Sequence, residues 1–337
     1  MALERHWYAP SALSLALLPV AWLFCALTAL RRWAYRSGLL AAYRAPVPVI
    51  VVGNISVGGS GKTPLVAWLV MLLRRHGWSP GIVSRGYGGT ARAWPQPVHA
   101  DSDPREVGDE PVLLARQCAC PVVVAPDRRA AVRALLAQGG CDVVVADDGL
   151  QHYPLERDIE VAVVDGTRRF GNGRCLPAGP LRERPSRLQD VDFVVSNGRA
   201  QRLEYPMTVN AGQAVNLKYP ARVRALSEFI GRPVHGVAGI GYPPRFFTQL
   251  RAAGLQVTEH PFEDHHAFEP ADLEFPGDAP ILMTEKDAVK CRRFASSRHW
   301  AVAAQAEVDA RFGERLLVLL EERVALRTPQ GVIRRGT

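Results

Sequence analysis

The stretch 51-VVGNISVGGSGKTPLVAWLV-70 decides how the first half of the chain folds. The segment VPVIVVGN has the pattern of a short buried strand, and VGGSGKT is a glycine-rich turn. PLVAWLVMLLRRHG then has the pattern of a helix that ends at Gly77. A strand, a glycine-rich turn and a helix in this order form the local structure of a P-loop. The sequence therefore predicts a site for the phosphates of a nucleotide.

The residue types in this turn suit that chemistry. Glycines leave backbone N–H groups free to face phosphate oxygens, and the helix N-terminus adds positive potential. Lys62 is expected to reach the β- and γ-phosphates and Thr63 to bind Mg²⁺. The turn departs from G-x-x-x-x-G-K-[ST] because Ser56 stands where the first glycine is expected. The predicted nucleotide-binding residues are Ser56, Val57, Gly58, Gly59, Ser60, Gly61, Lys62 and Thr63.

A second segment, 141-CDVVVADDGLQH-152, has the pattern of a buried strand that ends in Asp147 and Asp148. A carboxylate at a strand end can hold Mg²⁺ beside a P-loop, although Asp-Asp-Gly also occurs in plain turns. The pattern does not choose between the two aspartates. DIEVAVVD and VDFVVSN follow as further strands, and the alternation with helical stretches predicts an α/β fold: a P-loop-type parallel sheet with helices on both faces.

The N-terminal segment is strongly apolar. No residue from Ala9 to Leu30 is charged, and 22 residues in a helix reach ~33 Å, enough to cross a bilayer. Arg31, Arg32 and Arg36 follow, as expected for a cytoplasmic flank. This pattern predicts an N-terminal membrane helix. Pro19 leaves a second possibility, a kinked helix that lies in the membrane interface, and a buried core helix is the third.

The composition limits the class of partner. A formal charge of +8, with 47% hydrophobic residues, favours a folded protein that meets phosphates or a phospholipid surface. Nucleic acid is disfavoured, because no basic run is interleaved with aromatic residues. The six cysteines show neither C-x-x-C pairs nor zinc spacing, so we expect reduced and mostly buried thiols.

Several short motifs further identify the chain. They are GNISVGGSGKTP, SRGYGG (84–89), VGDEP (107–111), LPAGPLRE (176–183), EDHHAF (263–268) and MTEKDAVK (283–290). Together they resemble the tetraacyldisaccharide 4'-kinases of lipid A synthesis, from about residue 11 to residue 310. The resemblance implies a kinase on the cytoplasmic face of the inner membrane. Its cofactors would be ATP and Mg²⁺, and it would phosphorylate the 4'-hydroxyl of tetraacyldisaccharide 1-phosphate to give lipid IVA.

The resemblance also implies catalytic roles. Asp109 matches the proposed base and His265 the histidine that acts with it, with Lys62 on the phosphates. Glu110 is a further candidate for Mg²⁺, beside Thr63, Asp147 and Asp148. Taken alone, Asp109 could be an ordinary first-turn acid, and His265 and His266 a surface pair. Two basic groups could hold substrate phosphate or be solvated loops: Arg168, Arg169 and Arg174, and then Arg182 and Arg184.

The predicted organisation has five parts. Residues 1–36 form the anchor, 37–205 the P-loop domain and 206–220 a two-stranded linker. A smaller α/β domain follows at 221–325, and 326–337 is a loose tail. The glycines of GIGYP, Gly239 and Gly241, favour close packing over a second nucleotide site.

Two other functions fit a P-loop. One is a membrane-tethered ATPase or GTPase-type switch, although N-K-x-D for guanine is missing from the sequence. The other is a kinase for another small substrate. The expected partners are a lipid substrate and the membrane, and no protein partner is implied.

Overall fold

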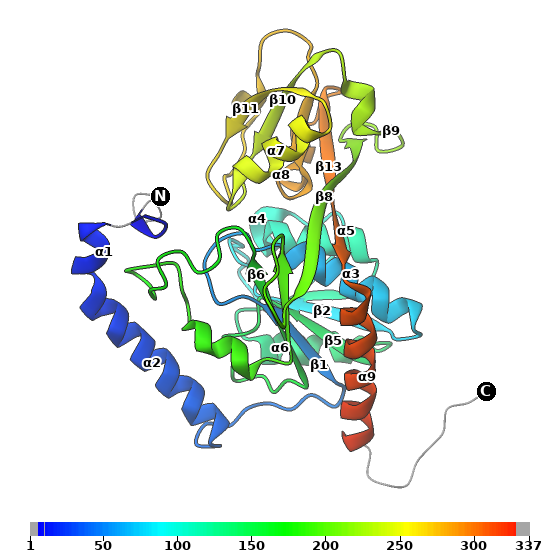
Figure 1. Ribbon diagram of the computed structural model, residues 1–337. Coiled ribbons are helices and arrows are strands. Elements are labelled where there is room, and N and C mark those ends of the chain that lie inside the picture. Colours follow the sequence, from blue (N-terminus) through cyan, green and yellow to red (C-terminus); the bar gives the residue numbers. More distant parts are fainter. Residues whose placement is uncertain (1–5, 10, 328–337) are drawn as a thin grey trace.

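The computed structural model describes residues 6–9 and 11–327. Its strands form one sheet, in the order β11-β10-β12-β13-β8-β7-β6-β1-β5-β2-β4-β3, with β9 (Val223–Arg224) paired to β8. The two halves of this sheet belong to two domains, one above the other in Figure 1. The predicted α/β fold with a mainly parallel sheet is confirmed.

The first domain is built on seven strands. They are β1 (Val49–Gly53), β2 (Pro80–Ser84), β3 (Gln96–Val98), β4 (Val122–Val124), β5 (Val143–Asp147), β6 (Ile159–Asp165) and β7 (Phe193–Asn197). All pair in parallel except β3, which runs antiparallel to β4. Successive side chains of a strand point to opposite faces. Ile50 and Val52 therefore enter one core cluster, and Val49 and Val51 enter the other.

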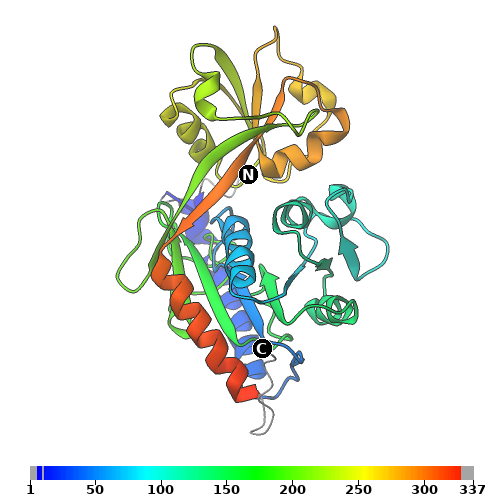
Figure 2. The ribbon, with the colours of Figure 1, turned by 90° about the vertical axis from the view of Figure 1, so that its right-hand side faces the viewer.

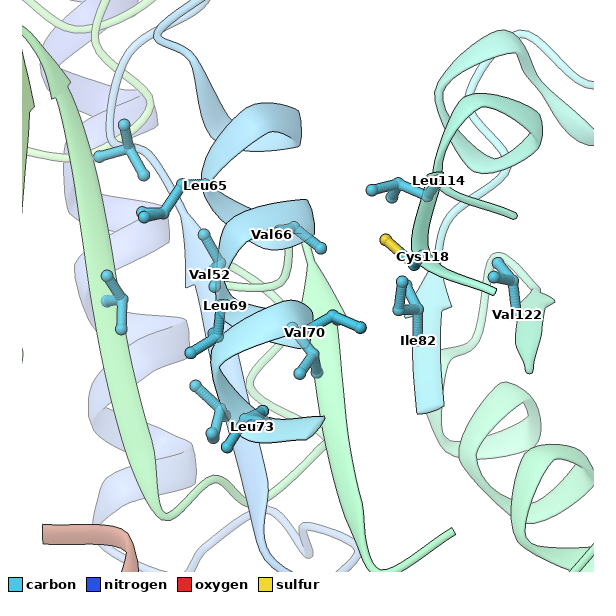
Figure 3. Packing of buried hydrophobic residues seen from close by; sticks show 14 of the residues in the cluster. Val52, Leu65, Val66, Leu69, Val70, Leu73, Ile82, Leu114, Cys118 and Val122 are labelled. Atoms are coloured by element: carbon cyan, nitrogen blue, oxygen red, sulfur yellow. The ribbon is translucent and has the colours of Figure 1, made fainter. Parts of the chain in front are cut away.

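Helices cover both faces of this sheet. The helices of the first domain are α3 (Lys62–Arg75), α4 (Pro104–Val107), α5 (Asp109–Cys118) and α6 (Arg128–Ala137). Apolar residues of α3 and α5 pack on one face, where Leu69 and Val70 are fully buried (Figure 3). Residues of α6 pack on the other face. The polar residues at the start of α3 and α5 thereby lie near the carboxyl ends of the strands.

The second domain continues the sheet. It contains β10 (Pro233–Ala238), β11 (Gln256–Pro261), β12 (Ile281–Thr284), α7 (Pro243–Ala252) and α8 (Glu285–Cys291). Two long antiparallel strands, β8 (Tyr205–Asn216) and β13 (His299–Val308), connect it to the first domain (Figure 2). The predicted linker at 206–220 holds only one of these strands. The other comes from a segment that the sequence analysis placed inside the second domain.

The last helix, α9 (Ala310–Arg327), also differs from its predicted place. It returns to the first domain, where Phe312 is fully buried with its ring 5.7 Å from that of Trp68 on α3. Arg327 ends the helix in an ion pair with Asp158, at 2.6 Å. An apolar pattern predicts a helix but does not identify the surface it covers. The rest of the predicted tail, 328–337, lies outside the described residues.

The N-terminal apolar segment does not form the predicted membrane helix. Within the part of the chain that the structure describes, no helix is both long enough and apolar enough to cross a bilayer. The segment forms α1 (Ala12–Ala16) and α2 (Leu18–Arg36), separated at Leu17. Pro19 lies in the first turn of α2, where a missing N–H is tolerated, and it cannot continue α1 because it has no donor for an earlier carbonyl.

The expectation of six reduced cysteines is also wrong. Cys25 of α2 forms a disulfide with Cys175, while Cys118, Cys120, Cys141 and Cys291 are free. The bonded pair is 150 residues apart in sequence, so no local spacing indicates it. The fold brings helix α2 beside the loop that carries Cys175, and this packing joins the sulfur atoms.

Candidate active site between the two domains

The P-loop connects β1 to α3. Gly58 and Gly61 adopt φ values of 101° and 95°, in the left-handed region that favours glycine. Ser56 does not need this freedom, because its backbone pairs with Leu181 in an isolated β-bridge. The N–H of Val57 donates to the carbonyl of Pro180 at 2.8 Å. The neighbouring chain thus supports the position where the common P-loop pattern has a glycine.

Two buried asparagines form hydrogen bonds with Ser60 of the P-loop. Nδ2 of Asn54 donates to Oγ of Ser60 at 3.3 Å, and Nδ2 of Asn197 donates to the carbonyl of Ser60 at 3.2 Å. All three residues are buried. Asn197 ends a strand that the sequence predicts, but its contact with the P-loop depends on strand order and was missed.

Lys62 begins α3, and its Nζ lies 3.5 Å from Oδ1 of Asp148. Arg182 also contacts Asp148, at 3.0 Å from both carboxylate oxygens. Burial alone would raise the pKa of Asp148, but Lys62 and Arg182 lower it well below its usual range. The second aspartate of the pair is therefore an ionised partner of two cations.

Asp147 has a different environment. It is fully buried, accepts a 3.4 Å hydrogen bond from Ser84, and its Oδ1 has no hydrogen-bond partner among the described residues. Burial and the negative charges of Glu110 and Asp148 raise its pKa to about 7, against the effect of Lys62. A buried carboxylate oxygen without a partner, near other carboxylates, is what a divalent cation would neutralise. Asp147 therefore fits a metal ligand.

The other residues predicted to bind a metal have different surroundings from Asp147. Within residues 6–9 and 11–327, no group of three His, Cys, Asp or Glu side chains forms a metal site by itself. Mg²⁺ is commonly held by one or two carboxylates together with substrate phosphates, so the described residues agree with such a site. Thr63 is in the first turn of α3, whereas Oε1 of Glu110 accepts a 3.0 Å hydrogen bond from Lys286.

Asp109 and His265 lie together across the domain boundary. Asp109 begins α5, after Gly108 with a φ of 92°, and is 5% exposed. Nδ1 of His265 is 3.2 Å from its Oδ2, while His266 contacts Asp272 at 2.9 Å instead. The structure therefore pairs Asp109 with His265 and not with His266.

The charges around this pair keep Asp109 ionised. Burial alone would raise the pKa of Asp109, but the hydrogen bond with His265 and the charges of Lys286 and Lys290 hold it well below its usual range. The hydrogen bond with Asp109 raises the pKa of His265, against burial and Lys286. The two lysines come from the motif MTEKDAVK. Their i, i+4 spacing, which puts both on one helix face, was the signal that sequence reasoning left unused.

The predicted arginines divide into two groups. Arg168 donates to the carbonyls of Gly59 and Gly241, each at 3.2 Å, and so joins the P-loop to the second domain. Arg182 contacts Asp148, as described above. Arg169 instead pairs with Glu204 at 2.7 Å, and Arg174 contacts Ser14 of α1 at 3.0 Å, so these two join distant parts of the chain.

The contact of Gly241 with the P-loop predicts a large effect of one methyl group. A Cβ atom at Gly241 would lie 2.5 Å from the backbone nitrogen of Gly59, closer than side chains approach backbone. We expect Gly241→Ala to raise the KM for ATP by about tenfold, or about 1.4 kcal/mol. Steady-state kinetics check this, with Ala252→Val, on the exposed side of α7, as the control. An unchanged KM for ATP would show that the two loops separate when ATP binds.

The chain is similar to known proteins over nearly its whole length. The family described as Tetraacyldisaccharide-1-P 4'-kinase matches residues 13–321. A relative from Nitrosococcus oceani named tetraacyldisaccharide 4'-kinase is 52% identical over 318 residues, 94% of each chain. One of the same name from Alkalilimnicola ehrlichii is 54% identical over 302 residues, 89% of this chain and 91% of the relative.

A solved structure is also similar. The crystal structure of LpxK from Aquifex aeolicus in complex with ATP has a TM-score of 0.77 and 28% identity, and the match covers 92% of this chain and 99% of that one. The match of the family over nearly the whole chain confirms the resemblance that the motifs suggested. The chain belongs to the tetraacyldisaccharide 4'-kinase family.

Proposed function

We propose that this chain transfers the γ-phosphoryl group of ATP to the 4'-hydroxyl of tetraacyldisaccharide 1-phosphate, giving lipid IVA in lipid A biosynthesis. One observation carries this proposal. Lys62 follows β1 and Asp147 ends β5, the charge of Glu110 on α5 acts on Asp147, and His265 of the second domain contacts the neighbouring Asp109. Ligands of open α/β sheets bind at the carboxyl ends of the strands.

Different residues have different roles in the phosphoryl transfer. The backbone N–H groups from Gly58 to Thr63 and the ammonium of Lys62 bind the phosphates of ATP, whereas the N–H of Val57 is already donated to Pro180. Asp109 accepts the proton of the acceptor hydroxyl, as an ionised carboxylate can. His265, which contacts Oδ2, holds this carboxylate in place.

Mg²⁺ is the expected companion of ATP here, and it would neutralise charge on the phosphates. We assign Thr63 and Asp147 as its protein ligands, since Oδ1 of Asp147 has no hydrogen-bond partner in the part of the chain that the structure describes. Asp148 stands beside them as the partner of Lys62 and Arg182. Glu110 is assigned to its contact with Lys286 and not to the metal.

The lipid acceptor requires that the enzyme meet a membrane, and we infer that α2 makes this contact on the cytoplasmic face of the inner membrane. Val20, Leu23, Leu27 and Leu30 recur at helical spacing and are 52%, 60%, 57% and 58% exposed. Arg31, Arg32 and Arg36 follow. An apolar helix face beside basic residues is the pattern of a helix that lies in the interface of an anionic bilayer.

This inference predicts the effect of two charges on α2. Leu23→Glu with Leu27→Glu should weaken partitioning onto anionic phospholipid vesicles, measured by sedimentation, by at least about tenfold, since each charge opposes insertion by about 1 kcal/mol or more. The matched control is Val318→Glu with Leu326→Glu on α9, where the side chains are 57% and 79% exposed. Equal loss in both double variants, or none in the first, would contradict a specific role of α2.

The function itself is tested by label transfer. Wild-type protein is incubated with γ-labelled ATP, Mg²⁺ and detergent micelles that carry tetraacyldisaccharide 1-phosphate. Label in the lipid product supports the proposal. Release of free phosphate without lipid labelling would instead indicate an ATPase or switch.

A further inference from the structure

Two lysines of α8 approach the Asp109–His265 pair and have no part in the reaction as proposed so far. Lys286 and Lys290 lie one turn apart on a helix of the second domain. Asp109 and Glu110 begin α5 of the first domain. The contacts between these helices therefore exist only when the two domains are held together as they are in this structure.

Lys286 is the more connected of the two. Its Nζ lies 3.0 Å from Oε1 of Glu110, 3.1 Å from Oδ1 of Asp264 and 3.4 Å from Nε2 of His265. Burial alone would lower its pKa, but Glu110, Asp109 and Asp264 raise it above the usual value. Lys286 is therefore an ammonium group whose three N–H donors are directed to partners from both domains.

These contacts decide where the proton of His265 lies. An ammonium group only donates, so Nε2 of His265 faces it as an acceptor and carries no hydrogen. The hydrogen of a neutral imidazole is then on Nδ1, which donates to the ionised Oδ2 of Asp109. A proton on Nε2 would point toward a positive charge 3.4 Å away. One lysine thus selects both the tautomer and the direction of the ring.

The other described groups around the imidazole ring of His265 do not select this tautomer. Asp109 holds Nδ1, and Asp264 lies 3.8 Å from Nε2 and accepts the backbone N–H of His265. The ring of Tyr87 stands 5.1 Å away, measured between ring centroids. Both carboxylates favour a doubly protonated ring, and burial and Lys286 oppose it. Among the described groups around the ring, Lys286 is the cation that faces Nε2.

We propose that Lys286 is a positioning residue for the phosphoryl transfer: anchored on Glu110 across the domain boundary, it fixes His265 with Nδ1–H toward Asp109 and with Nε2 unprotonated. The proposal rests on the roles given above to Asp109 and His265. It links domain closure to the chemistry, because the base is correctly oriented only when α8 meets α5.

Lys290 has a different task. Its Nζ lies 2.9 Å from Oδ1 of the fully buried Asp287, and 3.7 Å from Oδ2 of Asp109. Oδ2 of Asp287 accepts hydrogen bonds from the backbone N–H of Gly239 and from the hydroxyl of Thr284. Lys290 is part of the network that anchors α8, so its replacement would not isolate an effect on His265.

The test uses Lys286→Met and Lys286→Gln, which both remove the ammonium group. The glutamine of Lys286→Gln keeps an N–H donor for Glu110. This variant therefore tests the role of the ammonium group if Lys286→Met does not fold. Lys218→Met, at an exposed lysine of the same domain, is the matched control. Melting temperatures verify that each variant is folded before kinetics with ATP and tetraacyldisaccharide 1-phosphate are measured.

Two results are expected from Lys286→Met or Lys286→Gln. The kcat falls by about 10–100-fold, as for other groups that orient a functional side chain, while the KM for ATP changes less than about threefold. In ¹⁵N spectra of histidine-labelled protein at neutral pH, assigned with His265→Asn, Nε2 of His265 gains a proton that wild type lacks. Lys218→Met changes neither quantity.

Two outcomes would overturn this proposal, and they have different meanings. If His265→Asn lowers kcat but the Lys286 variants keep wild-type kcat and the wild-type spectrum, Lys286 does not position the ring. If His265→Asn itself retains wild-type kcat, the role proposed for the Asp109–His265 pair fails, and this inference fails with it.

Discussion

Lys62→Ala is expected to lower the kcat of phosphoryl transfer by at least about 10²–10³-fold, the loss seen when a single group that stabilises developing charge is removed. Lys62 begins α3 immediately after the P-loop and is 12% exposed in its side chain. Its ammonium group is expected to stabilise the negative charge on the transferred phosphoryl group. Label transfer from γ-labelled ATP to the lipid measures the effect.

The fold should survive this substitution. Asp148, which Lys62 approaches at 3.5 Å, remains paired with Arg182 at 3.0 Å, so this carboxylate keeps a cation partner. The melting temperature should therefore stay close to that of wild type, and loss of activity can be assigned to the chemistry. Lys218→Ala, at an exposed lysine, is the control. Activity of Lys62→Ala within tenfold of wild type would remove Lys62 from the mechanism.

The second large effect is expected at Asp109. Asp109→Asn keeps the volume of the side chain and an acceptor for the N–H of Glu110, which donates to Oδ1 at 2.9 Å. It removes the charge that accepts a proton, so kcat should fall by about 10²–10⁴-fold, the usual contribution of general base catalysis. The KM for ATP should change little, because Asp109 contacts His265 and not the P-loop.

The opposite pattern would give Asp109 another role. If the KM for ATP rises tenfold while kcat is retained, Asp109 helps to bind the nucleotide and is not the base. Asp147→Asn is the informative comparison, because Asp147 is assigned to the metal. A higher Mg²⁺ concentration should partly restore the activity of Asp147→Asn but not that of Asp109→Asn. Folding of both variants is followed by thermal melting, because both side chains are buried.

The parts of this protein that the sequence predicted are those encoded over short distances. The P-loop, the strand that ends in Asp147 and Asp148 and the α/β class follow from residue patterns of about ten positions. The motifs likewise identified the family, which the comparisons confirm. Such features depend on backbone conformation and on local alternation of apolar residues, which neighbouring residues set.

The errors concern the N-terminal segment and the surfaces that distant elements share. The length of the apolar run from Ala9 to Leu30 predicted a membrane helix, but the segment breaks at Leu17, and Cys25 is bonded to Cys175. The pattern of residues 310–327 predicted a helix, but only packing shows that Phe312 joins the core of the first domain.

What the sequence by itself determined is therefore the strand, turn and helix of the P-loop, the α/β class and the family. The tertiary structure alone decided which residues meet: Asp109 with His265 rather than His266, Lys286 with Glu110, and Gly241 with Gly59. These contacts join residues 156, 176 and more than 180 positions apart along the chain. Their physical origin is the long pair of strands β8 and β13, which places the second domain over the first, and no local pattern encodes that placement.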